Sequence, residues 1–255
     1  EDGSLIGSRP KDTKKVAKYL RKQDIPIQSV TEAVDLGIDT AAGRKRITSK
    51  AVQRRNKAKK RLAKIIRLRR VAALQKESRG LWNTGAIPQA VYGHQAFGMA
   101  INELQRLRRQ AGQVAGGKTR GRCLTTTWAV EMWKADPAMT IITPVIKEWI
   151  TMWQRFPEIH RRVVKAWPII RARLVRLGHQ RWRGVLGPVG AVLATLMNVG
   201  WHAPKATEWS RAVGTDGELV EQWDIPSVLD DSFKTTGCVQ PLIDDFETGI
   251  IKQRW

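Results

Sequence analysis

The chain has 255 residues, 42% of them hydrophobic, and a formal net charge of +22 at pH 7. This length and apolar content suffice for a buried core and exclude an intrinsically disordered chain. Two distant cysteines, Cys123 and Cys238, argue against a disulfide framework or a zinc site and fit a reducing compartment. The apolar runs are too short to span a bilayer and no secretory signal precedes them. We therefore expect an intracellular protein, nuclear or cytoplasmic, without a membrane partner.

Both ends of the chain suggest a segment of a longer polypeptide. The sequence begins with Glu1 in place of Met, and its last residues, Ile250–Trp255, carry no stop signal.

Residues 1–43 predict a small α/β piece. Leu5 and Ile6 suit a short strand, and a helix follows that ends near Gln23. The cap and the buried face of this helix are assigned to Asp12 or Thr13 and to Val16, Ala17 and Leu20. The apolar runs Ile25–Val30 and Ala33–Ile38 are separated by two polar residues, which predicts that they pair as strands.

A block of positive charge dominates the next part of the chain. Residues 44–76 contain fifteen Lys and Arg and no acidic residue. Neither Gly nor Pro interrupts Ile47 to Arg79, and Leu62, Ile65 and Ile66 recur at helical spacing, so we predict one long amphipathic helix. An ordinary soluble helix carries charges of both signs, whereas a face of one sign favours a polyanionic partner.

The candidate phosphate-binding residues are fourteen of the fifteen cations of this block, all except Lys76, and four cations after it. They are Arg44, Lys45, Arg46, Lys50, Arg54, Arg55, Lys57, Lys59, Lys60, Arg61, Lys64, Arg67, Arg69, Arg70, Arg108, Arg109, Lys118 and Arg120. The last two lie in a Gly-rich segment that predicts a basic hinge, although a solvated loop explains them equally well.

The region between Gly80 and this hinge predicts a loop followed by two helices. Trp82–Pro88 is the loop, and Pro88 suits the first position of the next helix. That helix is expected to bury Val91, Tyr92, Phe97 and Met99. Asn102–Gln110 continues as helix.

Residues 124–255 predict a Trp-rich helical region. Thr143 and Pro144 form a cap and first-position pair, and Pro157 ends that helix. Glu158–Leu177 forms another helix, kinked or split near Pro168. The helix after Pro144 is expected to bury Val145, Trp149, Ile150, Met152, Trp153 and Phe156. Trp149 and Trp153, four residues apart, favour a core position over a platform for nucleic-acid bases.

The same region contains a second basic population, for which a solvated surface is an equal alternative. Its members are Arg161, Arg162, Lys165, Arg171, Arg173, Arg176, Arg181 and Arg183. A compact helix follows Gly187-Pro188 and ends before Gly200. Asp216-Gly217 predicts a hairpin between Trp209–Val213 and Glu218–Trp223, and Pro226 begins a last helix.

No catalytic or metal-binding constellation emerges from the sequence. The four histidines stand alone, and neither a phosphate-binding glycine loop nor a nucleophile elbow is present. The acidic pairs Asp230/Asp231 and Asp244/Asp245 suggest a two-metal nuclease, but adjacent residues on a helix point about 100° apart. A solvated helix face is the preferred interpretation.

The fold class predicted is therefore mainly α, with a small α/β piece, a long basic helix and a Trp-rich helical region that includes a short hairpin. The domain boundaries we expect are 1–43, 44–112, a hinge at 113–123, and 124–255.

Three stretches, in this order and spacing, resemble a known family. They are Gly3–Ser8 with the helix at Lys14–Gln23, the strand Ala33–Asp39 (AVDLGID), and the basic helix followed by Ile87–Gly98 (IPQAVYGHQAFG). Over residues 1–112 the chain resembles the part of a non-LTR retrotransposon reverse transcriptase that follows the catalytic palm motifs. The stretches match the segment after the Tyr-x-Asp-Asp hairpin, the strand that closes the palm, and the thumb helices with their Tyr-Gly element. Residues from 120 onward resemble, more loosely, downstream regions of retroelement proteins from unicellular eukaryotes.

This resemblance implies a non-catalytic nucleic-acid-binding segment whose parent is an RNA-directed DNA polymerase. The palm carboxylates and their Mg²⁺ would lie upstream, so no cofactor is expected in this segment. The implied partners are RNA, an RNA/DNA duplex and the upstream palm domain, with no small-molecule substrate. A free-standing RNA-binding or ribonucleoprotein scaffold is the alternative, and a nuclease that uses Asp230, Asp231, Asp244 and Asp245 is a weaker third.

Overall fold

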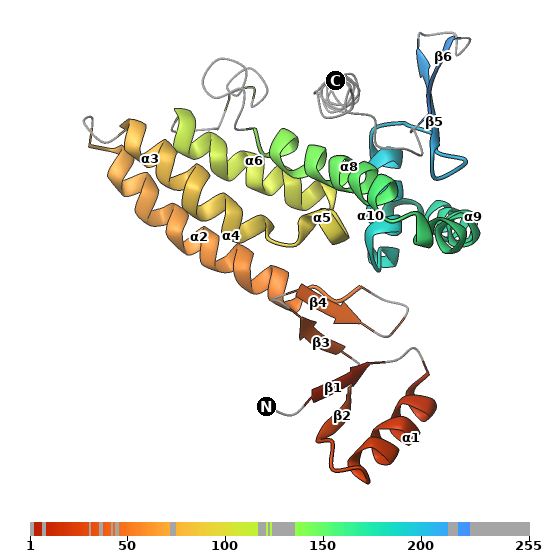
Figure 1. Cartoon of the computed structure of the whole chain (residues 1–255). Coiled ribbons are helices and arrows are strands. Elements are labelled where there is room, and N and C mark those ends of the chain that lie inside the picture. The colour runs from red at the N-terminus through yellow and green to blue at the C-terminus, as the bar shows by residue number, and fades with distance from the viewer. Residues whose placement is uncertain are drawn as a thin grey trace.

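The protein is mainly helical, with three two-stranded sheets at its periphery (Figure 1). This computed structural model describes residues 3–6, 9–30, 32–35, 38–41, 43, 46–71, 75–116, 121, 123, 136–213 and 219–224. The predicted fold class is confirmed. The predicted last helix after Pro226 and the four candidate nuclease aspartates lie outside the described residues.

The first unit is a β-α-β arrangement. Strands β1 (Gly3–Ile6) and β2 (Ile27–Val30) pair in parallel, with Gly3 opposite Ile27, and helix α1 (Pro10–Arg21) connects them. The helix starts at Pro10, three or four residues earlier than a cap at Asp12 or Thr13 predicts, and Val16 is 46% exposed, contrary to expectation. A connection long enough to hold a helix is what a parallel pair needs.

The predicted pairing of the two apolar runs after α1 is wrong. Strand β2 pairs with β1, and β3 (Glu32–Asp35) pairs instead with β4 (Ile38–Ala41) in antiparallel fashion. The expected run Ala33–Ile38 is divided between β3 and β4, and β2 pairs with β1 because the chain returns through α1.

The predicted single helix to Arg79 is also wrong. Helix α2 (Ser49–Arg69) ends, and α3 (Gln75–Leu81), the π-helical turn η2 (Trp82–Ala86) and α4 (Ile87–Val91) run back alongside it (Figure 1). Trp82, expected in a loop, is fully buried with Leu62 and Ile65 in one core cluster. The chain therefore turns back after α2 because this indole is buried against the apolar side of α2, and not because of a local stop signal.

A glycine ends α4 earlier than expected. Gly93 has φ +79°, and a Cβ at this position would lie 2.9 Å from the side chain of Ile38. Tyr92 consequently points outward and is 52% exposed, which corrects its predicted burial. The short helix α5 (His94–Phe97) follows, and α6 (Ile101–Gly116) then packs along α2 and α3.

Helix α8 (Pro137–Arg155) joins the two hydrophobic clusters of the molecule. Ala138 and Ile141 belong to the cluster of α2, whereas Trp149 and Trp153 belong to a second cluster farther along the chain. Thr143 is not a helix cap, because Asp136 caps α8 and Pro144 lies inside the helix. Phe156, expected to be buried, is 45% exposed.

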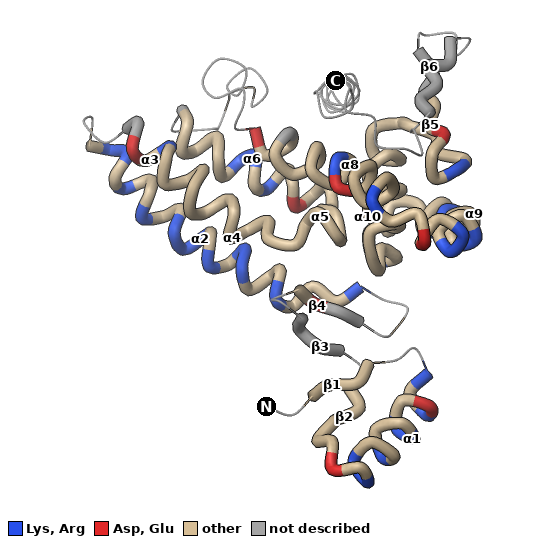
Figure 2. The backbone as a smooth tube through the Cα atoms, in the orientation of Figure 1, with Lys and Arg blue, Asp and Glu red and all other residues tan. Residues whose placement is uncertain are grey.

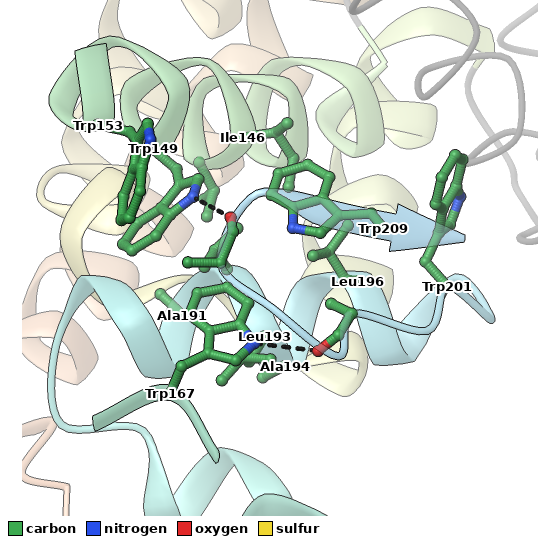
Figure 3. Close-up of a cluster of buried hydrophobic side chains, with 14 of the residues drawn as sticks. Ile146, Trp149, Trp153, Trp167, Ala191, Leu193, Ala194, Leu196, Trp201 and Trp209 are labelled. Atoms are coloured by element: carbon green, nitrogen blue, oxygen red, sulfur yellow. Dashed lines mark hydrogen bonds between the residues drawn. The ribbon is translucent and has the colours of Figure 1, made fainter. Parts of the chain in front are cut away.

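The second cluster lies between α8, α9 (His160–Leu177) and α10 (Pro188–Asn198) (Figure 3). The indole of Trp149 stacks at a tilt on Trp167 with 5.3 Å between ring centroids. The Trp167 Nε1–H donates to the carbonyl of Ala203 at 3.0 Å, and that of Trp149 to Ala206 at 3.4 Å. The expectation that Trp149 and Trp153 are core residues is confirmed.

Two short 3₁₀ segments, η4 (Pro157–Ile159) and η5 (Gly178–Gly184), connect these helices. Helix α9 runs through Pro168, and Pro157 follows the end of α8 as predicted. Strands β5 (Glu208–Val213) and β6 (Leu219–Asp224) pair antiparallel with Trp209 opposite Trp223, which confirms the predicted hairpin. In the part of the chain that is described, no helix combines the length and apolarity required to cross a membrane.

His94 is a buried titratable residue of this helical body. Burial lowers the pKa of His94 below its usual 6.5, and carbonyl groups of Val91 and Thr140 act in the opposite direction. The His94 Nδ1 lies 2.6 Å from the Val91 oxygen, as expected for a neutral ring that donates from Nδ1. Pro144 has no N–H, so the carbonyl of Thr140, four residues earlier, lacks its helical donor.

We expect the free energy of unfolding to fall as the pH drops from 6.5 toward the lowered pKa of His94. In this window the unfolded chain binds the proton and the folded chain does not, so acid favours unfolding. Urea unfolding at a series of pH values would measure the effect. The variant His94→Gln should have a flatter pH dependence, whereas His179→Gln, which changes an exposed histidine, should follow the parent curve.

Candidate nucleic-acid interface

The outward side of α2 carries a row of exposed cations, which we call the cationic stripe. Its members are Lys57, Lys60, Arg61, Lys64 and Arg67. Their spacing of three and four residues places them on one side of the helix, opposite the buried Ala58, Leu62 and Ile65. The 21 residues of α2 include no acid. Figure 2 shows the resulting line of positive charge along this helix.

Asp39 holds the start of α2 and was missed by the sequence reasoning. Its carboxylate accepts from the Ser49 hydroxyl at 2.9 Å and from the backbone N–H groups of Lys50 and Ala51 at 2.9 and 3.2 Å. An acidic group at a helix N-terminus satisfies unpaired N–H groups and interacts favourably with the helix dipole. Because Asp39 lies on β4, ten residues before Ser49, no local capping signal could identify it.

Three of the predicted phosphate ligands, Arg46 just before α2 and Arg54 and Arg55 on it, instead contact neighbouring parts of the protein. Arg46 donates to the Gly98 carbonyl at 2.9 Å, and its guanidinium lies 5.9 Å from the Trp182 ring. Burial lowers the pKa of Arg46 to about 10. Arg54 donates to the Tyr92 carbonyl at 3.2 Å and lies over the Tyr92 ring. Arg55 forms an ion pair of 2.6 Å with Glu103 on α6.

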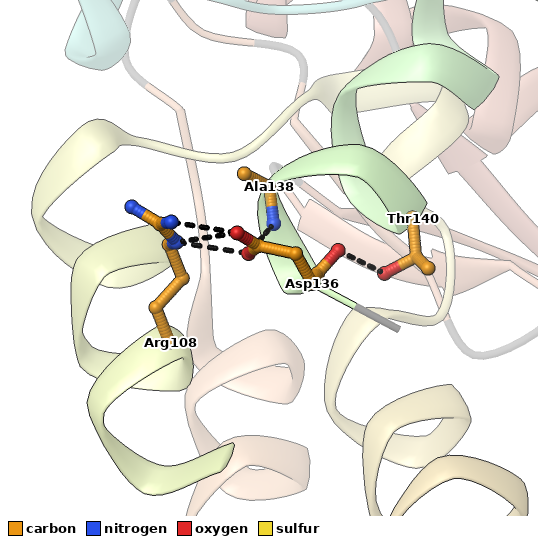
Figure 4. Close-up of polar contacts among 4 residues, drawn as sticks. All are labelled: Arg108, Asp136, Ala138 and Thr140. Atoms are coloured by element: carbon orange, nitrogen blue, oxygen red, sulfur yellow. Dashed lines mark hydrogen bonds and ion pairs between the residues drawn. The ribbon is translucent and has the colours of Figure 1, made fainter. Parts of the chain in front are cut away.

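Arg108 does not lie on the predicted interface. Its guanidinium makes three hydrogen bonds to Asp136, from Nε to both carboxylate oxygens at 2.8 and 3.1 Å and from Nη2 at 2.6 Å (Figure 4). Only 3% and 11% of the two side chains are exposed. Asp136 also accepts from the Ala138 N–H at 2.8 Å and so caps α8. Arg108 follows the buried Leu104 by four residues, so its inward position was visible in the helical period.

The remaining candidates are distributed around the stripe. Lys50, Lys59, Arg70 and Arg109 are exposed, and Arg69 is half-buried. Arg61 reaches the Gly85 carbonyl at 3.3 Å while staying exposed. Arg44, Lys45, Lys118 and Arg120 lie outside the described residues.

Helix α9 presents the second basic population. Arg161, Arg162, Lys165 and Arg176 are exposed, and His160–Leu177 contains no acid. Exposed Val164, Ile169 and Val175 lie among them, with Ile169 71% exposed. This face is thus less hydrophilic than an ordinary solvated one, a property that charge counting alone did not reveal.

The described residues hold no group of three potential metal ligands. Comparisons of the chain with protein-family models, curated proteins and solved structures find no match.

Proposed function

We propose that this chain binds nucleic-acid duplexes through their phosphates and without reading base sequence. The observation that carries the proposal is the cationic stripe on the acid-free helix α2. In this interpretation the segment acts as the thumb-like part of a reverse transcriptase and grips RNA or an RNA/DNA duplex, while an upstream palm performs polymerisation. The catalytic residues would belong to that palm.

The dimensions of the stripe suit a phosphate backbone. Ten residues separate Lys57 from Arg67, which corresponds to about 15 Å along a helix, and one strand presents about four phosphates over that distance. Three of the five side chains are lysines, which act as hydrated point charges rather than as bidentate readers of base edges. Contacts of this kind position a duplex and carry no sequence information.

A rigid support favours gripping over loose electrostatic association. Arg54 and Arg55 attach one side of α2 to the Tyr92 carbonyl and to Glu103, and Asp39 holds its first turn. The stripe therefore keeps a constant spacing when it meets a ligand, and little ordering of the backbone is needed on binding.

A ribonucleoprotein scaffold without polymerase ancestry is the second candidate. The exposed, acid-free face of α9 supports it, because two basic surfaces on one molecule can hold two RNA segments. The sequence upstream of Glu1 separates the two candidates: a Tyr-x-Asp-Asp motif within some tens of residues favours the polymerase.

We expect the unmodified chain to bind duplexes of scrambled sequence with similar affinity and a strong salt dependence. If about five side chains neutralise phosphates, the slope of log K against log salt concentration should be roughly −4 to −5. Fluorescence anisotropy with labelled RNA/DNA duplexes measures both quantities. A slope near zero, or a more than about tenfold preference for one sequence, would contradict a phosphate grip.

A further inference from the structure

A groove lies between α2 and α6, beside the cationic stripe. It has a volume of about 390 Å³. We call it the α2–α6 groove, and its lining residues are Val52, Arg55, Asn56, Lys59, Glu103, Arg106, Leu107, Arg109 and Gln110. Small-molecule sites commonly enclose about 300–1,000 Å³, so a ligand of nucleotide size fits.

The groove carries an excess of positive charge. Its four cations face one carboxylate, and that carboxylate, Glu103, is paired with Arg55 at 2.6 Å. Lys59, Arg106 and Arg109 are exposed, and the described residues supply no carboxylate for them. Burial lowers the pKa of Arg55, Glu103 opposes this, and Arg54 and Arg106 lower it further, as expected where cations crowd together.

The rest of the lining matches a nucleobase. Val52, which is 41% exposed, provides apolar surface, while Asn56 and Gln110 provide amide donors and acceptors that can reach the edge of a base. A site for phosphate alone would have no use for apolar surface beside its cations. Phosphate, apolar face and amides are the three recognition elements of one nucleotide unit.

We propose that the α2–α6 groove binds a nucleotide unit, with its phosphate on Lys59, Arg106 and Arg109 and its base on Val52. Glu103 holds Arg55 at the base of the site. The ligand is either a free mononucleotide or one residue of a single strand. This goes beyond the proposed duplex grip, because the groove takes an unpaired nucleotide and lies beside the cationic stripe.

The test compares the double variant Arg106→Ser/Arg109→Ser with the matched control Arg161→Ser/Arg162→Ser on α9. Both remove two exposed charges. A labelled, 5′-phosphorylated trinucleotide at about 100 mM salt is the probe, and the groove variant should bind it about 10- to 50-fold more weakly, against less than about twofold for the control. Equal losses in the two variants would overturn the proposal.

Competition identifies the ligand. Adenosine 5′-monophosphate should displace the trinucleotide at lower concentration than inorganic phosphate does, because the base adds apolar contact. Equal competition would show an anion site only and overturn the nucleotide assignment. Mononucleotide affinity close to that of the trinucleotide indicates a free nucleotide as ligand, and a much tighter trinucleotide indicates a strand.

Two further measurements distinguish a loss of trinucleotide binding in the groove from misfolding and from a change in duplex binding. Asn56→Asp adds one negative charge at an exposed position in the groove and should also weaken trinucleotide binding. Duplex binding by Arg106→Ser/Arg109→Ser should change by less than about threefold, because the stripe is intact. If the parent chain does not bind duplexes, the proposed function is rejected. The trinucleotide measurement still tests nucleotide binding in the groove independently.

Discussion

Replacing Lys57, Lys60, Lys64 and Arg67 together with glutamine is expected to weaken duplex binding by about 100- to 1,000-fold at about 100 mM salt. Four phosphate contacts would be lost, so the slope of log K against log salt should also become shallower by about 3 to 4. All four side chains are exposed on α2, and glutamine is nearly as good a helix former as lysine. Fluorescence anisotropy across a salt series measures both effects.

The matched control removes four exposed charges from α9, as Arg161→Gln, Arg162→Gln, Lys165→Gln and Arg176→Gln. If the stripe grips the duplex, this control should lose far less affinity and keep most of the salt slope. The same loss in both variants would mean that binding follows the net charge of the molecule rather than the surface of α2.

The variant Asp136→Ala is expected to lower the free energy of unfolding by about 3–5 kcal/mol. It leaves the buried guanidinium of Arg108 without a partner and removes the cap of α8 at once. This pair connects α6 to α8, and α8 contributes to both hydrophobic clusters. The loss of stability should therefore affect the global unfolding transition and not only one part of the protein. Urea unfolding followed by tryptophan fluorescence measures it.

A second pair of variants separates the buried charge from the cap. Arg108→Met together with Asp136→Asn should cost less than the sum of the two single changes, because no lone charge remains buried. Asp12→Ala, which breaks the exposed pair between Arg9 and Asp12, should cost under about 1 kcal/mol. Strictly additive losses in the first pair would contradict the coupling assigned to Arg108 and Asp136.

The candidate site was partly predictable from the sequence. The cationic face of α2 follows from an acid-free run with apolar residues at helical spacing, and both signals are local. Neighbouring residues do not reveal which of these cations are free to bind phosphate. Arg54 and Arg55 are close to Lys57 in sequence, yet both contact the protein, Arg54 at the Tyr92 carbonyl and Arg55 at Glu103. The α2–α6 groove was not foreseen, because its two walls are about fifty residues apart in sequence.

The amino-acid sequence alone determined the mainly helical class, the basic helix, the Trp core and the hairpin around Asp216-Gly217, because each depends on periodicity or turn chemistry within a few residues. Tertiary structure decided where α2 stops, since burial of Trp82 requires the chain to turn back, and that β2 pairs with β1, since α1 supplies the crossover. It also decided that Asp136 rather than Thr143 begins α8, because a buried carboxylate needs the distant Arg108. Local sequence patterns determine which helices and strands form. Contacts between apolar and charged groups far apart in sequence determine where these elements end and which of them pack together.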